Sequence, residues 1–370
     1  MSLDLTERLL QLTVAAVAAL AALGGGIAPR PSARPLPPFR WQVPADTAER
    51  APHRLFDSAD PLDVTLAADF GAVAKDRGTE KRLHPGLLSY RSPAGDTVSL
   101  SVQLHTRGHY RLRICEFPPL KVEFDRAAGA GAAHTLFAHQ GNLKLVVQCR
   151  GSRAFANYLL EEYLIYRVYN QLTPESFRVR LARVTYVDPS GKQAPATRFA
   201  FFLEDDDRMA QRNHTQVLEQ KGIGQGGTEF DQMGLVTVFQ YMIGNTDWSV
   251  AGLHNIVLLR DSAGILYPVP YDFDWSGVIS PPYAQPDSRL GIRTVRDRLY
   301  RGTCRTPDDF APLVAQFNAA KDSIYALYRG QPDLEPKRVE QALGYYDEFY
   351  RTINDPRRMK REFIDGCGGS

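Results

Sequence analysis

The stretch that decides the fold reads Gly244-Asn245-Thr246-Asp247-Trp248, then His254-Asn255, then Pro270-Tyr271-Asp272-Phe273-Asp274. The apolar run 235–243 before it predicts a helix. Segments 255–260 and 265–269 predict a hairpin, because two strand-like runs flank a short polar turn. An Asp after a helix is on its own a weak indication, since most such residues are caps or turn residues. The joint order of helix, Asp, Asn, hairpin and Asp is more specific.

This order meets the needs of phosphoryl transfer. That reaction needs a divalent metal held by carboxylate and amide oxygens, a lysine on the phosphates, and a carboxylate that orients the attacking hydroxyl. Protein kinases present these groups in one order along the chain. Here the predicted strands with Lys121 and Lys144 come first, then a predicted helix with Glu162. An acidic linker at Glu204 and the catalytic segment 244–277 follow.

These segments resemble the catalytic segment of the CotH-type spore-coat protein kinases and, more distantly, that of the HipA-type toxin kinases. The likeness covers about residues 98–280 and includes Arg107-Gly108 and Phe117-Pro118-Pro119-Leu120-Lys121. It implies an ATP-dependent kinase that uses Mg²⁺ or Mn²⁺ and phosphorylates a hydroxyl of a protein acceptor. The implied fold is α+β and two-lobed, protein-kinase-like, with a small mixed β-rich N-lobe at 61–205 and a mostly helical C-lobe at 206–370.

The resemblance also assigns roles to single residues. Asp247 is the catalytic base, and Asn255 and Asp272 are metal ligands, with Asp274 as the alternative to Asp272. The residues implied to bind the nucleotide are Arg107, Lys121, Lys144, Glu162 and Glu204. Lys121 is expected to pair with Glu162, which lies on an apolar helix stripe and needs a cation, and Lys144 is the other candidate.

The sequence departs from the kinase pattern in two respects. Eight positions separate Asp247 from Asn255, more than in the standard kinase loop, and no glycine-rich G-x-G-x-x-G loop is present. A metal hydrolase is disfavoured because no histidines form an H-x-x-x-H pair on a predicted helix, and a serine hydrolase because G-x-S-x-G is absent. The alternative that stays open is a catalytically inactive, kinase-like nucleotide-binding or envelope-assembly module. The net charge of +2 gives no reason to expect nucleic acid as a partner.

The N-terminal segment predicts export. The run 9–23 is apolar except for Gln11 and Thr13 and is too short for the roughly 20 residues of a membrane-spanning helix. It matches the hydrophobic part of a secretory signal, so 1–28 is predicted to be a signal peptide or an N-terminal anchor. The Pro-rich segment 29–60 is predicted to be a linker. We therefore expect a periplasmic or secreted protein with no stable membrane span beyond an N-terminal anchor.

The four cysteines fit an oxidising compartment. None has C-x-x-C spacing, which disfavours a zinc site. Cys115 and Cys149 lie in the predicted N-terminal strands, and we expect them to pair. Two buried free thiols are the alternative.

Overall fold

The computed structural model describes residues 55–78, 80–124, 135–138 and 140–367. The chain divides into two compact units, Met1–Pro37 and Pro38–Ser370, and every described residue belongs to the second. The predicted signal peptide or anchor at 1–28 and most of the predicted linker at 29–60 lie outside the described residues.

Helices are interspersed among the strands of the described chain up to β10, and only helices follow from residue 307 onward. The strands are β1 (Leu62–Ala68), β2 (His84–Arg91), β3 (Thr97–Thr106), β4 (Leu120–Phe124), β5 (Asn142–Val147), β6 (Val179–Val187), β7 (Ala196–Leu203), β8 (Gln216–Leu218), β9 (Ile256–Arg260) and β10 (Leu266–Pro270). The helices are α2 (Phe70–Lys75), α3 (Tyr110–Ile114), α5 (Arg153–Asn170), α6 (Asp206–Arg212), α7 (Phe230–Ile243), α8 (Pro307–Arg329), α9 (Pro336–Ile353) and α10 (Pro356–Met359).

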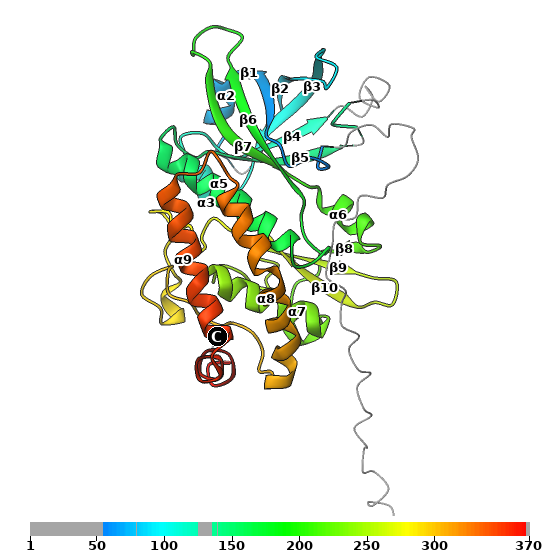
Figure 1. Ribbon diagram of the computed structural model, residues 1–370. Coiled ribbons are helices and arrows are strands. Elements are labelled where there is room, and N and C mark those ends of the chain that lie inside the picture. Colours follow the sequence, from blue (N-terminus) through cyan, green and yellow to red (C-terminus); the bar gives the residue numbers. More distant parts are fainter. Residues whose placement is uncertain (1–54, 79, 125–134, 139, 368–370) are drawn as a thin grey trace, which may run out of the picture. The chain divides into compact units, whose positions relative to one another are not determined.

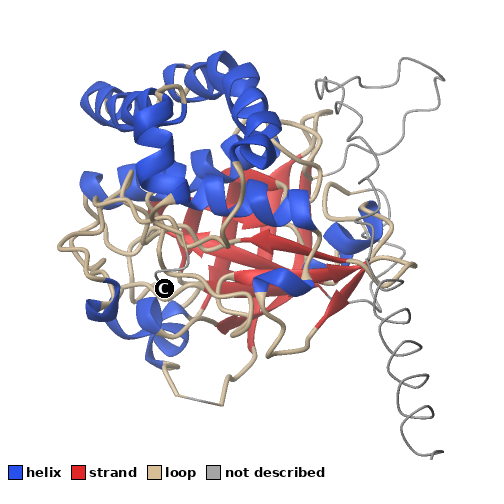
Figure 2. Cartoon of the chain, turned by 90° about the horizontal axis from the view of Figure 1, so that it is seen from below, coloured by secondary structure: helices blue, strands red, loops and turns tan. Residues whose placement is uncertain are grey.

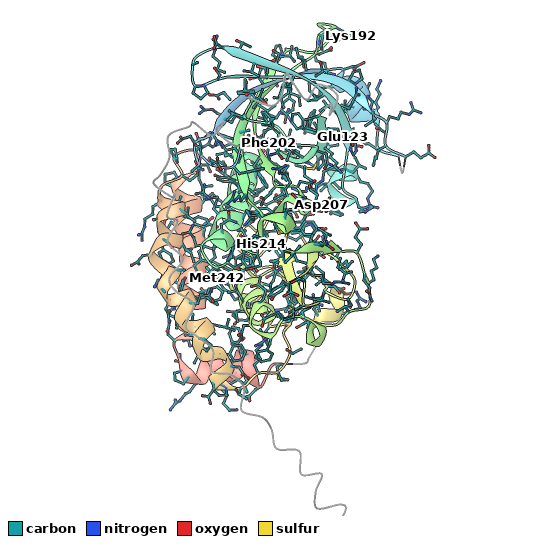
Figure 3. The ribbon with its side chains drawn as sticks, turned by 90° about the vertical axis from the view of Figure 1, so that its right-hand side faces the viewer. Glu123, Lys192, Phe202, Asp207, His214 and Met242 are labelled. Atoms are coloured by element: carbon teal, nitrogen blue, oxygen red, sulfur yellow. A yellow bond between two sulfur atoms is a disulfide. The ribbon has the colours of Figure 1, made fainter. Side chains whose placement is uncertain are left out.

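Seven strands close into a barrel in the order β1-β2-β3-β4-β5-β7-β6 (Figure 1). Neighbouring strands are antiparallel except β1 and β6, which run parallel and complete the ring from Leu62 opposite Ala182 to Ala67 opposite Val187. Side chains alternate across each strand, so one set points inward. Phe202 is one of these buried interior residues, and Figure 3 labels it.

A second core lies between the outer face of the barrel and the helices. Helix α5 contacts β6, β7 and α8, and its apolar side chains share one buried cluster with Phe201, Leu203 and Met242. Figure 3 labels Met242 of this cluster, and Figure 2 shows the helices beside the strands. Helix α8 begins with a capping box formed by Thr306 and Asp309, with Pro at its first turn.

The predicted hairpin is present as β9 and β10, with Leu266 opposite Arg260 and Pro270 opposite Ile256. Strand β8 pairs with β9, so the three form a small sheet in the order β10-β9-β8. The chain from 271 to 306 is irregular apart from a 3₁₀ turn at Ser288–Leu290.

The prediction of a two-lobed protein-kinase-like fold is wrong. Seven strands form a closed barrel of mixed direction, and in the described part of the chain no mostly helical C-lobe stands apart from it. The helices share a core with the barrel's outer face, and residues 206–306 include three strands and a long irregular segment. The sequence predicted the strands with Lys121 and Lys144 and the β9–β10 hairpin. It carried no sign of the parallel β1–β6 pairing, because that pairing joins segments more than a hundred residues apart.

Two disulfides link described residues. Cys115 is bonded to Cys149, which confirms the predicted pair, and Cys304 is bonded to Cys367. Disulfides of this kind are typical of proteins from oxidising compartments. Among the described residues, no helix combines the length and the apolar character that crossing a membrane requires.

Candidate functional site

The β9–β10 hairpin brings Asn255 and Asp272 to the same end of the strand pair, with Tyr271 opposite Asn255. Asn255 immediately precedes the pairing of β9, Asp272 follows β10, and the backbone N–H of Tyr271 donates to the carbonyl of Asn255 (3.0 Å). Both residues have left-handed backbones, with φ of 53° at Asn255 and 59° at Asp272. Asn and Asp tolerate this conformation better than most residues, and strained positions cluster at functional sites.

Asp247 reaches the same place from the end of helix α7. The helix stops at Gly244, whose φ of 69° suits glycine, and a Cβ there would lie 2.0 Å from Tyr345 Oη. The side chain of Asn245 then accepts a hydrogen bond from the backbone N–H of Asp247 (3.0 Å). Arg301 fixes the far side of this loop by donating to the carbonyl of Trp248 (2.9 Å).

The Asp247 carboxylate has two partners. Asn255 Nδ2 donates to Asp247 Oδ2 (3.1 Å) and to the Asp247 carbonyl (2.7 Å), so the amide and the carboxylate are held together. His254 Nε2 lies 2.8 Å from Asp247 Oδ1. That hydrogen bond raises the pKa of His254 above its ordinary value, although partial burial opposes the rise. Asp247 is half-exposed and therefore open to an incoming group.

A buried arginine neutralises the carboxylates next to this end of the β9–β10 hairpin. Arg111, on helix α3, lies 3.0 Å from Glu162 Oε2, 2.7 Å from Asp272 Oδ1 and 3.4 Å from Asp274 Oδ2. Glu162 comes from α5, so one guanidinium joins three separate segments. A charge in such surroundings is stable only when it is paired and hydrogen-bonded.

Three carboxyl groups share this one cation. Burial raises the pKa of Asp274 well above its usual range and also raises that of Glu162, while Arg111 opposes both shifts. Burial would also raise the pKa of Asp272, but Arg111, with Arg107 and Lys144 nearby, brings it below the ordinary value. Asp272 is therefore the carboxyl group of the cluster that ionises most readily, and it is the most exposed of the three.

Two tyrosines hold the acidic residues in position. The backbone N–H of Asp272 donates to Tyr166 Oη of helix α5 (2.8 Å). Tyr283 Oη donates to Asp274 Oδ2 (3.2 Å). Phe273, between the two aspartates, is fully buried against Tyr166, so Asp272 and Asp274 are anchored on both sides.

Helix α3 is itself fixed from two sides. The Cys115–Cys149 disulfide ties its C-terminal end to the chain just before α5. Arg77 donates to the carbonyls of Leu112 (2.7 Å) and Cys115 (3.0 Å). The bond between these cysteines thus helps to hold Arg111 against α5.

Lys144, on strand β5, lies on the side of the site that the barrel forms. Its Nζ is 2.7 Å from Asp206 Oδ1 of α6 and lies over the rings of Tyr271 (5.1 Å) and Phe177 (5.7 Å). Burial lowers its pKa, and Asp206 opposes that shift. Lys121 is directly opposite Lys144 in the β4–β5 pairing, on the same outer face of the barrel.

The structure separates the predicted nucleotide-binding residues into groups. Lys144 and Arg107 both act electrostatically on Asp272, so they belong to its surroundings. Glu162 is paired with Arg111 and not with either predicted lysine. Glu204 is buried and accepts from Arg212 Nη2 (2.9 Å) and from the Arg178 backbone (3.0 Å), which ties α6 to the barrel.

The oxygen atoms at the hairpin suit a hard divalent cation. Among the described residues, no group of three or more His, Cys, Asp and Glu side chains is arranged to hold a metal ion. Asn255 Oδ1, however, accepts no hydrogen bond within the described chain, while its Nδ2 is fixed by Asp247. Asn255 Oδ1 and the Asp272 carboxylate are oxygen donors of the kind that Mg²⁺ takes when phosphates supply further ligands. Asn255 and Asp272 therefore fit such an ion.

Arg111 and His254 are the site residues that sequence reasoning missed. The apolar stripe around Glu162 required a cation, and the expected Cys115–Cys149 bond would have brought Arg111 to α5. His254 adjoins Asn255 in the sequence, but a single histidine indicates no role by itself.

No family model matches this sequence, and neither the curated proteins nor the solved structures include a significant match.

Proposed function

We propose that this protein transfers a phosphoryl group from a nucleotide, ATP, to a hydroxyl of a protein acceptor with the help of Mg²⁺ or Mn²⁺. The proposal rests on the convergence of Asp247, Asn255 and Asp272 at one end of the β9–β10 hairpin, next to Lys144. It does not rest on the fold, which differs from the one that the sequence predicted.

Each group has a distinct task in this proposal. Asp272 and Asn255 would hold the divalent ion, which when bound neutralises charge on the phosphates. Lys144 Nζ, with Arg107 nearby, contacts phosphate oxygens. Arg111 keeps Asp272 ionised and oriented, so it is a positioning residue.

Asp247 orients the attacking hydroxyl. The acceptor oxygen forms a bond to the transferred phosphorus while the bond from that phosphorus to the nucleotide's bridging oxygen breaks. The hydroxyl proton passes to the Asp247 carboxylate, and the nucleoside diphosphate leaves with the electron pair of the broken bond. Asn255 and His254 fix the carboxylate's orientation.

One observation favours a second candidate, a nucleotide-binding module without transfer activity. Arg111 already neutralises Asp272 and Asp274, and the Asp247 carboxylate already has two hydrogen-bond partners. A protein that binds nucleotide and metal through Lys144 and Asp272 but leaves the phosphate in place would use the same residues.

We further propose that the protein is exported to the periplasm or the medium, with 1–28 as its signal peptide or anchor. The two disulfides support an oxidising compartment. A reporter fused after residue 45 should then appear outside the cytoplasm. A reporter found wholly in the cytoplasm with an intact N-terminus would contradict export.

The decisive experiment is incubation of the purified protein with γ-labelled ATP and Mg²⁺ or Mn²⁺. Transfer predicts metal-dependent label on the protein itself or on an added protein acceptor. Asp247→Asn should lose that label while the folded structure is kept. Nucleotide binding without any label would favour the binding module, and absence of both would reject the phosphoryl-transfer proposal.

A further inference from the structure

A polar hollow of ≈ 590 Å³ opens along helix α9, and none of its lining residues belongs to the hairpin site. One wall is a single stripe of α9 that includes Arg338, Gly344 and Arg351. The other wall comes from the segment after Asp274 and includes Ser280 and Arg296. Its volume is in the range of ligand sites, but its lining is charged rather than apolar.

The positive charge of the hollow is only partly compensated. Arg338 is engaged by the buried Glu161, with its Nε 3.1 Å from Glu161 Oε2. Glu348, the acidic lining residue, lies 3.5 Å from Arg298. Within the described chain, neither Arg296 nor Arg351 forms an ion pair.

These two arginines are therefore available to an anion. Arg296 is exposed and packs against the ring of Tyr345 (5.0 Å), with Nη1 3.3 Å from the carbonyl of Gly277. Arg351 is also exposed, and its Nε donates weakly to the Asp347 carbonyl (3.4 Å). Both guanidinium groups keep free N–H donors, the fork that recognises carboxylates.

Gly344 keeps the hollow open. It lies in the interior of α9, where glycine is among the poorest helix formers. A Cβ at this position would meet no heavy atom within 4 Å, so packing does not require glycine. Because Gly344 has no side chain, the space next to the arginines stays free.

The hollow continues along the helix. A second hollow of ≈ 390 Å³ shares Arg351 and is also lined by Lys321, Tyr350, Asn354 and the acidic Asp347, which lies 3.9 Å from Lys321. From Arg338 to Arg351 the helix rises about 20 Å. An extended peptide of about six residues covers that length.

We propose that this groove along α9 binds an acidic peptide segment of about six residues. The carboxylates of the peptide pair with Arg296 and Arg351, and its backbone crosses Gly344. The site requires no nucleotide and no phosphoryl transfer, so it stands or falls independently of the proposed function.

A fluorescently labelled hexaglutamate peptide tests this proposal by fluorescence polarisation at low salt. We expect saturable binding by the full chain that weakens as salt is added. Arg296→Ala and Arg351→Ala should each weaken it about tenfold, the loss expected for one charge-assisted hydrogen-bonded pair. Gly344→Leu should block binding by filling the groove, and this variant should fold because leucine favours helices and meets no clash.

Three controls separate the groove from general charge attraction. Arg91→Ala removes the same charge from an exposed residue at the end of strand β2 and should leave binding unchanged. Gly344→Ala adds only a methyl group and should retain most of the binding. Inorganic phosphate or free glutamate at the peptide's concentration should not compete. If the peptide fails to bind, if the groove variants bind like Arg91→Ala, or if free glutamate competes equally, the peptide site is excluded.

Discussion

Arg111 Nη2 lies 2.7 Å from Asp272 Oδ1, although 161 positions separate the two residues in the chain. The same guanidinium contacts Glu162, so it joins the helix next to the Cys115–Cys149 disulfide to the helix behind the hairpin. The orientation of Asp272 therefore depends on a cation supplied by the N-terminal half of the described chain. Stability and site geometry are coupled at this residue.

Replacing Arg111 by Met should strongly destabilise the protein. Methionine has similar length but no charge, so Glu162, Asp272 and Asp274 would lose their shared cation in a buried place. Removing one partner of a buried ion pair typically costs about 3–5 kcal/mol. Urea unfolding at neutral pH measures this loss. Arg113→Met is the matched control, because Arg113 is exposed on the same short helix, and it should change the free energy of unfolding little. Equal effects of the two changes would show that the cluster does not depend on Arg111.

Lys144→Ala should weaken Mg·ATP binding more than Lys121→Ala. Lys144 lies close enough to act on Asp272, while Lys121 is its cross-strand neighbour on the outer face. Loss of a charged hydrogen bond to phosphate is worth about 1.5–3 kcal/mol, or about tenfold or more in affinity. Calorimetric titration of both variants measures the difference. A larger effect of Lys121→Ala would reassign the phosphate contact to that lysine.

Local patterns predicted several elements and part of the site. The strands with Lys121 and Lys144, the helix stripe around Glu162 and the helix before Asp247 each depend on neighbouring residues, and each is present in the structure. The hairpin brings Asn255 and Asp272 together because a strand pair returns the chain to its starting edge.

Long-range pairing could not be predicted in the same way. Closure of the barrel requires β1 to meet β6, and nothing in the composition of either strand specifies that partner. The cation for Glu162 was expected from the stripe, but its identity depended on where α3 lies. From the sequence alone, the partner of Glu162 could equally be a half-buried lysine on a strand or an arginine on a short helix. Only the arrangement of the disulfide and Arg77 selects Arg111.

The buried Glu161 should make stability depend on pH. Burial raises the pKa of its carboxyl to about 8, even though Arg338 and Arg296 lower it. Tyr328 and Tyr346 are the other titratable groups that face it. The folded state therefore holds this proton more tightly than the unfolded state, whose carboxyl has the ordinary pKa of 4.5. Its contribution to stability is complete below about pH 4.5 and is lost as the pH rises to about 8.

Glu161→Gln isolates that contribution. Glutamine cannot ionise, so the stability of this variant should depend less on pH. Between pH 5 and pH 8 its free energy of unfolding should fall less than that of the unmodified protein, by up to a few kcal/mol. Urea unfolding at several pH values provides the measurement. Glu340→Gln, an exposed change on α9, should follow the unmodified protein. Parallel pH curves for Glu161→Gln and the unmodified protein would rule out the raised pKa as a source of pH dependence.

Asp247 and Asp272 should differ in what their loss removes. In the proposed reaction Asp272 holds the divalent ion, so Asp272→Asn should lower both metal-dependent ATP binding and transfer. Asp247 orients the acceptor hydroxyl, so Asp247→Asn should leave binding largely intact and lower transfer by about 10²–10⁴-fold, the usual range for a general base.

The two variants are a matched pair, because each replaces one carboxylate by the amide of the same shape. The Asp247 backbone contacts with Asn245 and Asn255 do not involve its carboxylate, so the loop should keep its conformation in Asp247→Asn. Titration of Mg·ATP affinity and measurement of the transfer rate on both proteins separate the roles. Full transfer by Asp247→Asn would remove it from the chemistry. Unchanged metal-dependent binding by Asp272→Asn would show that the ion is held elsewhere, and the division of labour at the hairpin would then have to be abandoned.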